Sequence, residues 1–297
     1  MRILVTGASG WIGSASVAQL IAAGHHVLGL ARTDEAAAKV AALGAEVVRG
    51  SLDDLAGLRA AAARAEGVVH LGYNHDFSQM AAAAQTDRAA IDVFADVLEG
   101  TAGPLLIASG TLGLAPGRVG TEADTPNPAV HPRVANAAYT LGLAGRGIRA
   151  IVVRFAPTVH GAGGDHGFVA VLAHIARKKG LSAYIGEGAN RWPAVNRLDA
   201  GKLVQLAVDK AAPGTVLHAV AEEGIATRDI ATALGQFLNV PVEAIPADRA
   251  GEHFGWLGPF FGADAPASNA RTRELLGWEP TRATLLEDIA AGHYPGI

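Results

Sequence analysis

Short apolar runs alternate with longer stretches rich in alanine and leucine through the first half of the chain. The short runs contain mostly β-branched residues or leucine, and each is followed by a stretch long enough for a helix that crosses back to the next run. This alternation is typical of a parallel sheet covered by helices on both faces. We predict six strands of one sheet, at Ile3–Val5, Val27–Leu30, Glu46–Arg49, Gly67–Leu71, Leu105–Ala108 and Ile151–Arg154.

The stretches between these runs have helical periodicity. Two of them begin at Asp, and several are followed directly by glycine, as at Gly24, Gly44 and Gly147; both residue types commonly cap helices. The predicted crossover helices are Gly13–Ala23, Asp34–Leu43, Asp54–Ala65, Met80–Glu99 and Pro132–Arg146.

The residue pattern changes after Arg154. Glycine and loop-forming residues surround a helical stretch at Gly167–Lys179, and aromatic residues cluster further on, in Pro241–Pro266. The strand-like run Thr215–Val220 is expected to return to the main sheet. The fold class predicted is therefore α/β, a doubly wound parallel sheet with a smaller, interleaved C-terminal lobe. We expect residues 1–155 to form the sheet domain and 156–297 mainly the lobe, with 194–220 returning to the main sheet.

Composition narrows the classes of function. Of 297 residues, 50% are hydrophobic and 18% are charged, with a formal net charge of −4 and no cysteine. This balance is typical of a globular protein, and no run of Lys or Arg is longer than Arg177–Lys179, so the sequence does not suggest a nucleic-acid backbone as a partner. The lack of cysteine excludes disulfides and thiolate sites, and no apolar run reaches the roughly 18 residues that span a bilayer. We expect a cytoplasmic protein without nucleic-acid or membrane partners.

The first predicted strand leads directly into a glycine-rich turn that opens the first helix. Glycines recur there at every third position, which allows a tight turn, close packing of helix on strand, and approach of a pyrophosphate to the free N–H groups at the helix start. Because the motif lies between strand and helix, it predicts a Rossmann dinucleotide site in residues 1–155. The residues expected to line this turn are Gly7, Ser9, Gly10, Trp11, Ile12 and Gly13.

The end of the second predicted strand bears on the choice of dinucleotide. An acidic residue there would bind the ribose 2′-hydroxyl of NAD, but this chain has Arg32. A guanidinium suits a 2′-phosphate, so the sequence favours NADP(H). The alternative is that Arg32 is solvated and that Asp34 takes the ribose.

These residues and several later segments resemble the short-chain dehydrogenase/reductase superfamily, in its extended branch of epimerase-, dehydratase- and reductase-like proteins, over nearly the whole chain. The segments that carry the resemblance are 6–13, 50–54, 70–73, 108–111, 154–161 and 186–199. The resemblance implies that Ser51 and Leu52 lie beside the adenine, although Ser51 stands where Asp is usual. It also implies a homodimer that pairs through two helices.

The resemblance assigns roles at the reacting end as well. Leu71, Gly72 and Tyr73 would border the ribose and nicotinamide. Pro157, in the segment that leads from the sixth strand to the pocket, would also contact the cofactor. Ser109 or Thr111 would hydrogen-bond the reacting oxygen. In this family an arginine at the position of Arg191 often holds a charged part of the substrate.

The catalytic Tyr-x-x-x-Lys pair of the family is absent. The helix register places Arg133 at the lysine position and Ala129, which has no proton to donate, at the tyrosine position. Tyr139 lies too far along the helix to replace it, so we interpret it as a packing residue. The candidates for a substitute acid are His131, Tyr73, His75 and His160, each of which is also compatible with a structural role.

The sequence motifs of a metal site and of a serine hydrolase are absent. No H-E-x-x-H motif occurs, and histidines near a dinucleotide site are commonly polar lining, so we expect no metal. No G-x-S-x-G elbow follows a strand. The leading hypothesis is an NADP-dependent oxidoreductase that transfers hydride between nicotinamide and a small carbonyl or alcohol substrate. The alternative is a non-catalytic NADP-binding sensor or scaffold protein of the same fold.

Overall fold

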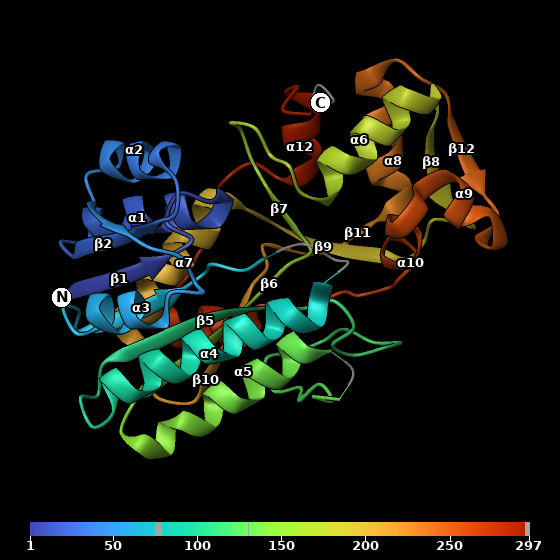
Figure 1. Cartoon of the computed structure of the whole chain (residues 1–297). Helices are drawn as coiled ribbons and strands as arrows, with labels where there is room; N and C mark the ends of the chain where they lie inside the picture. The colour runs from blue at the N-terminus through green and yellow to red at the C-terminus, as the bar shows by residue number, and fades with distance from the viewer. Residues whose placement is uncertain (75–78, 130, 295–297) are drawn as a thin grey trace.

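A seven-stranded parallel sheet lies at the centre of the larger lobe in the computed structural model (Figure 1). The structure describes residues 1–74, 79–129 and 131–294. The strand order is β10-β6-β5-β4-β1-β2-β3, so the chain runs outward from β1 in one direction and then restarts on its other side at β4. The strands are β1 (Arg2–Thr6), β2 (His26–Ala31), β3 (Glu46–Arg49), β4 (Gly67–His70), β5 (Pro104–Gly110), β6 (Arg149–Phe155) and β10 (Thr215–Ala219).

Helices cover both faces of the sheet because successive strand residues point to opposite sides. In β1, Ile3 and Val5 belong to the core on one face, whereas Leu4 belongs to the core on the other. Helices α1 (Trp11–Ala22), α2 (Asp34–Ala42) and α7 (Arg197–Lys210) pack on the first face. Helices α3 (Leu55–Ala62), α4 (Met80–Leu98) and α5 (Pro132–Gly142) pack on the second.

The predicted fold class, a doubly wound α/β sheet, is confirmed, and the ends of the elements differ by a few residues. The predicted helix 132–146 ends at Gly142 and continues as a 3₁₀ turn over Leu143–Arg146. The predicted strand at 215–220 is β10, which pairs with β6 in the main sheet. Residues 194–196, by contrast, belong to β9 (Arg191–Asn196), which pairs with other strands in a second sheet.

The smaller lobe has its own hydrophobic core. Its three-stranded sheet has the order β11-β9-β7, and β12 pairs with β8 in a two-stranded one. Its remaining elements are β7 (Thr158–His160), β8 (Ser182–Ile185), β11 (Glu222–Ala226), β12 (Val242–Ile245), α6 (Phe168–Lys179), α8 (Thr227–Leu238), α9 (Ala250–Phe254), α10 (Gly258–Phe261), α11 (Ala270–Leu276) and α12 (Leu285–Ala290), with short 3₁₀ turns at Ala247–Arg249 and Gly255–Leu257. Of these, α11 packs against β10 and α7 on the main sheet.

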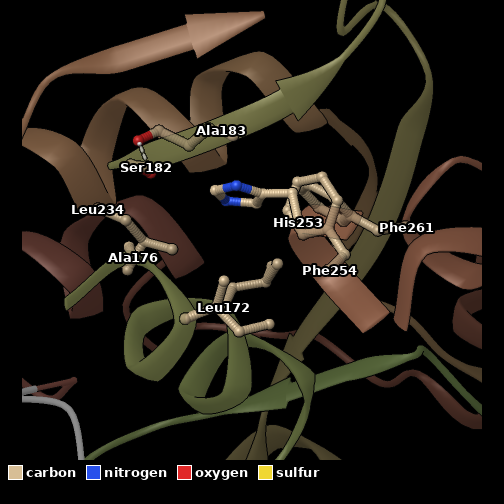
Figure 2. Close-up of a pocket in the computed structure, with 10 residues that line it drawn as sticks. Leu172, Ala176, Ser182, Ala183, Leu234, His253, Phe254 and Phe261 are labelled. Carbon is tan, nitrogen blue, oxygen red and sulfur yellow. Dashed lines mark hydrogen bonds between the residues drawn. The ribbon is translucent and has the colours of Figure 1, made fainter. Parts of the chain in front are cut away.

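A small hollow lies inside the core of this lobe. Figure 2 shows His253, Phe254 and Phe261 facing Leu172 and Ala183 across it. Burial, followed by the nearby charge of Lys179, lowers the pKa of His253. The hollow is lined mainly by apolar side chains and is part of the packing of the lobe. Within the described ranges, no helix is long and apolar enough to cross a membrane.

Candidate active site at the carboxyl edge of the sheet

The glycine-rich turn lies where the strand order reverses, because β1 pairs with β2 on one side and with β4 on the other. This switch point is the usual ligand crevice of an open α/β sheet. The turn is too tight for side chains at two of its glycines. A Cβ on Gly13 would lie 1.9 Å from the carbonyl oxygen of Gly7, and Gly7 itself has a φ of 68° with its own Cβ position 2.8 Å from the amide nitrogen of Gly72.

The start of α1 suits an anion. Its N-cap, Gly10, provides no side-chain hydrogen bond, and the first turn carries no acidic residue. Free N–H groups and the helix dipole therefore point at the exposed face of Gly10 without a competing carboxylate. Trp11 ties this turn to the small lobe by donating from Nε1 to the carbonyl oxygen of Val159 at 2.7 Å. Ser9 and Ile12 are half-buried in the same turn.

Two arginines lie at the carboxyl ends of β2 and β3, where the sequence predicts the adenine side of the dinucleotide. Arg32 directly follows β2 and is exposed, and no carboxylate of the described chain lies within ion-pair distance of it. Arg49 ends β3 beside Ala31. Its Nη1 donates to the carbonyl oxygen of Thr33 at 2.7 Å, and its Nη2 lies 3.0 Å from Asp34. Asp34, the acidic residue that competes with Arg32 in our prediction, is thus already paired with a cation.

The turn after β3 carries the other residues expected near the adenine. Ser51 and Leu52 are half-buried there, and Leu52 packs against the core that α3 and α4 cover.

Two hydroxyl groups lie at the end of β5, next to β4 in the sheet. Ser109 and Thr111 are both buried, at 6% and 1% exposure. The backbone N–H of Thr111 donates to the carbonyl oxygen of Phe155 at 3.0 Å, which fixes the segment against β6. Its Oγ1 is buried and has no hydrogen-bond partner in the described chain. A buried hydroxyl without a partner is costly, so this group is suited to a ligand oxygen. Pro157 lies half-buried just beyond β6.

Arg133 and Tyr73 form a stacked pair. Arg133 lies in the first turn of α5, and its Cζ is 4.3 Å from the centre of the Tyr73 ring. Its Nε is buried without a hydrogen-bond partner, and burial lowers the pKa of the guanidinium. Burial also raises the pKa of the Tyr73 hydroxyl, and the positive charge of Arg133 opposes that rise. Tyr73 is therefore protonated at neutral pH and is held beside a cation.

His131 serves as the N-cap of α5. Its Nδ1 accepts a hydrogen bond from the backbone N–H of Arg133 at 3.1 Å, and burial lowers its pKa. A neutral imidazole that caps a helix has no second proton to supply. His75 lies outside the described residues. Ala129 precedes the helix in an exposed loop, with its N–H bonded to Asn127.

A buried polar network that the sequence did not predict lies behind Arg133. Because the Asp87 carboxylate can only accept, we assign the His70 proton to Nε2, so that Nδ1 accepts from the Thr6 hydroxyl at 2.6 Å. The Thr6 oxygen also accepts from the backbone N–H of Gly72. His70 Nε2 then donates to Asp87 at 3.1 Å, and Asn136 donates to the other oxygen of that carboxylate at 2.7 Å.

Burial opposes the charged form of Asp87, but hydrogen bonds from His70 and Asn136 hold its pKa below the usual value. The negative charge of Asp87 and the positive charge of Arg133 attract each other, which favours the charged form of both groups. A sequence signal exists: Asp87 falls on the buried face of α4, at helical spacing from Ala83, Ala84, Ala90 and Ile91.

Other candidates have structural partners. His160 Nδ1 lies 2.6 Å from Asp288 on α12, so it joins β7 to the C-terminal helix. Arg191 forms a bidentate salt bridge with Asp264, in which Nε donates to Oδ1 at 3.0 Å and Nη2 donates to Oδ2 at 2.9 Å. Tyr139 donates to Asp92 at 2.6 Å on the outer side of α4 and α5, in agreement with the packing role assigned to it. No cluster of three or more potential metal ligands occurs in the described part of the chain.

Relatives of this chain are known over its full length. An uncharacterized protein of Schizosaccharomyces pombe is 46% identical over 99% of this chain and 100% of its own, and an uncharacterized protein of Saccharomyces cerevisiae is 43% identical over 99% of both.

Solved structures with the same fold are more distant in sequence. The UDP-glucose 4-epimerase of Thermotoga maritima, determined with UDP-glucose, has a TM-score of 0.76 at 21% identity and covers 98% of this chain and 96% of its own. The Thermus thermophilus UDP-glucose 4-epimerase, determined with NAD, has a TM-score of 0.75 at 22% identity and covers 100% of this chain and 99% of its own. The model of the NAD dependent epimerase/dehydratase family matches residues 3–220. With the glycine-rich turn at the switch point of a doubly wound sheet, this match shows that the chain belongs to the NAD dependent epimerase/dehydratase family.

Proposed function

We propose that this protein is an NADP-dependent oxidoreductase that interconverts a small carbonyl compound and its alcohol. The observation that carries the proposal is the convergence of three features at neighbouring strand ends. These are the glycine-rich turn after β1, the Tyr73–Arg133 pair after β4, and the unpartnered hydroxyl of Thr111 after β5. A binding turn, a held proton donor and a free hydrogen-bond donor are what carbonyl reduction requires.

Each residue has a defined task in this proposal. The nicotinamide supplies or accepts the hydride when the cofactor is bound. Arg133 takes the position of the family's lysine, where its charge stabilises the ribose end of the cofactor and any negative charge on the substrate oxygen. Thr111 and Ser109 donate hydrogen bonds to that oxygen. Tyr73, protonated at neutral pH, delivers the proton to it.

Cofactor preference gives the first test. Arg32 directly follows β2, Arg49 ends the adjacent β3, and Asp34 is paired with Arg49. We therefore expect NADPH to bind at least about tenfold tighter than NADH, or about 1.4 kcal/mol. Arg32→Ala should remove most of that preference and leave the affinity for NADH unchanged. Titration of both cofactors measures this, and an unchanged preference in the variant would place Arg32 outside the 2′-phosphate site.

The substrate proposed is small and carries no diphosphate. The structural neighbours named above include one determined with UDP-glucose. In this chain Arg191, the position that the resemblance assigns to a charged part of the substrate, is neutralised by Asp264. Three aromatic side chains of the small lobe, Phe168, Trp256 and Phe260, contact one another, are partly exposed and offer apolar contact area.

Tyr73→Phe tests the proton donor. Removal of the hydroxyl should lower the rate of carbonyl reduction about 10²-fold, since a positioned acid contributes about 10²–10⁴. The affinity for NADPH should change less than threefold, because the ring still stacks on Arg133. Single-turnover reduction followed by NADPH absorbance separates the two effects. A full rate in the variant would assign the proton to another group.

Ala129 at the tyrosine position favours a second candidate, a non-catalytic NADP sensor or scaffold. A panel of aldehydes, ketones, imines and activated alkenes with NADPH distinguishes the two. Tight NADPH binding with no oxidation above background across the panel would support the sensor and reject the enzyme. We further propose that the protein is cytoplasmic and forms a homodimer. Sedimentation of the purified chain tests the dimer.

A further inference from the structure

Arg197 lies beside the glycine-rich turn although it comes from a distant part of the chain. It is the first residue of α7, and its guanidinium carbon is 4.5 Å from the centre of the Trp11 ring. Trp11 is the first residue of α1 and is held in place by its hydrogen bond to Val159. The stacking therefore positions a cation next to the first turn of α1.

The small-lobe side of the crevice is shaped to admit this side chain. A Cβ on Gly161 would lie 3.3 Å from Cγ of Arg197, and one on Gly163 would lie 3.6 Å from its Nη2. Both glycines have positive φ angles, of 148° and 104°. A side chain at Gly161 would therefore be in tight contact with the arginine and one at Gly163 in ordinary contact, and the positive φ angles favour glycine at both positions.

The charge of Arg197 has no counterpart in the described chain, where no carboxylate lies within 4.0 Å of its guanidinium. Arg191, six residues earlier, pairs with Asp264, and Arg49 pairs with Asp34. A half-buried arginine without an anionic partner, stacked beside a helix start that also lacks an acid, is suited to an anion from outside the chain.

We propose that Arg197 binds the diphosphate of the dinucleotide, with Trp11 as the surface on which it rests. The N–H groups of α1 and the guanidinium of α7 then meet the diphosphate from two sides. This inference rests on the proposed function only in requiring that a dinucleotide binds. It requires neither NADP preference nor turnover, because NAD and NADP share the diphosphate.

Three ligands distinguish diphosphate binding by Arg197 from binding of the 2′-phosphate and from a general disturbance of the site. ADP-ribose carries the diphosphate without a nicotinamide, 2′-AMP carries the adenosine and 2′-phosphate without a diphosphate, and NADP⁺ carries both. Arg197→Met keeps an unbranched side chain on Trp11 and removes the charge. We expect it to weaken ADP-ribose and NADP⁺ about tenfold or more, measured by calorimetry, and to leave 2′-AMP unchanged. Arg197→Lys should lie between, and Arg177→Met, at the exposed end of α6, is the matched control.

Two results would overturn the assignment. One is an unchanged affinity of Arg197→Met for ADP-ribose, and the other is an equal loss for 2′-AMP, which would indicate a general disturbance of the site. Arg32→Ala should show the opposite pattern, with 2′-AMP weakened and ADP-ribose unchanged. If wild-type protein binds no ADP-ribose, this inference fails together with the dinucleotide site. If it binds ADP-ribose but shows no NADP preference or turnover, only the proposed function fails.

Discussion

A Gly10→Val variant is expected to fold normally and to lose at least about 100-fold in affinity for NADP⁺, or about 2.7 kcal/mol. Gly10 is exposed at the start of α1, with φ −77° and ψ 178°, a conformation that valine adopts readily. A Cβ there would meet only the Gly7 carbonyl oxygen, at 3.1 Å. The added side chain therefore fills the space in front of the helix N–H groups, where the diphosphate must approach. Calorimetric titration together with a thermal melt measures both properties.

Gly13→Ala is the matched comparison three residues on. Its Cβ would lie 1.9 Å from the backbone oxygen of Gly7, and a backbone atom cannot move away as a flexible side chain can. We expect destabilisation of about 3 kcal/mol or more, visible as a lower Tm without any ligand. If Gly10→Val kept its affinity while Gly13→Ala unfolded, the turn would be a purely structural element and the dinucleotide site would be refuted.

Removal of both hydroxyls at the end of β5, in the double variant Thr111→Val with Ser109→Ala, is expected to lower turnover about 10²–10³-fold. Thr111 Oγ1 is buried without a partner, so it costs the folded protein free energy that a ligand oxygen would recover. The affinity for NADPH should stay within about twofold. Steady-state reduction of the best carbonyl substrate, with separate cofactor titration, gives both numbers.

Two controls sharpen this test. Thr111→Ser keeps a hydroxyl at the same position and should retain most of the rate. Tyr139→Phe removes a hydroxyl that binds Asp92 on the outer side of α4 and α5, so neither rate nor affinity should change. An intact rate in the double variant would leave the enzyme hypothesis standing and move the oxygen-binding site elsewhere.

Local patterns in the sequence were sufficient for the fold. The alternation of apolar runs and amphipathic stretches depends on which side of each strand and helix is buried, and such periodicity is present within a few residues. For the same reason the glycine-rich turn could be interpreted without tertiary information. Gly13 must be glycine because of the carbonyl of Gly7, which is close in sequence. The exact ends were less predictable, as at α5, where the last turn tightens into a 3₁₀ turn.

Partners of charged side chains were decided only by the tertiary structure. The sequence contains Arg49, Arg191 and Arg197 without showing that the first two face Asp34 and Asp264 or that the third lies on Trp11. Nor does it show the cap that His131 forms or the bonds between His70 and Asp87. These pairings join segments that only the crossover connections bring together. A charged residue at a given position is compatible with solvent, a partner or a ligand, and the element that packs across from it determines which one it meets.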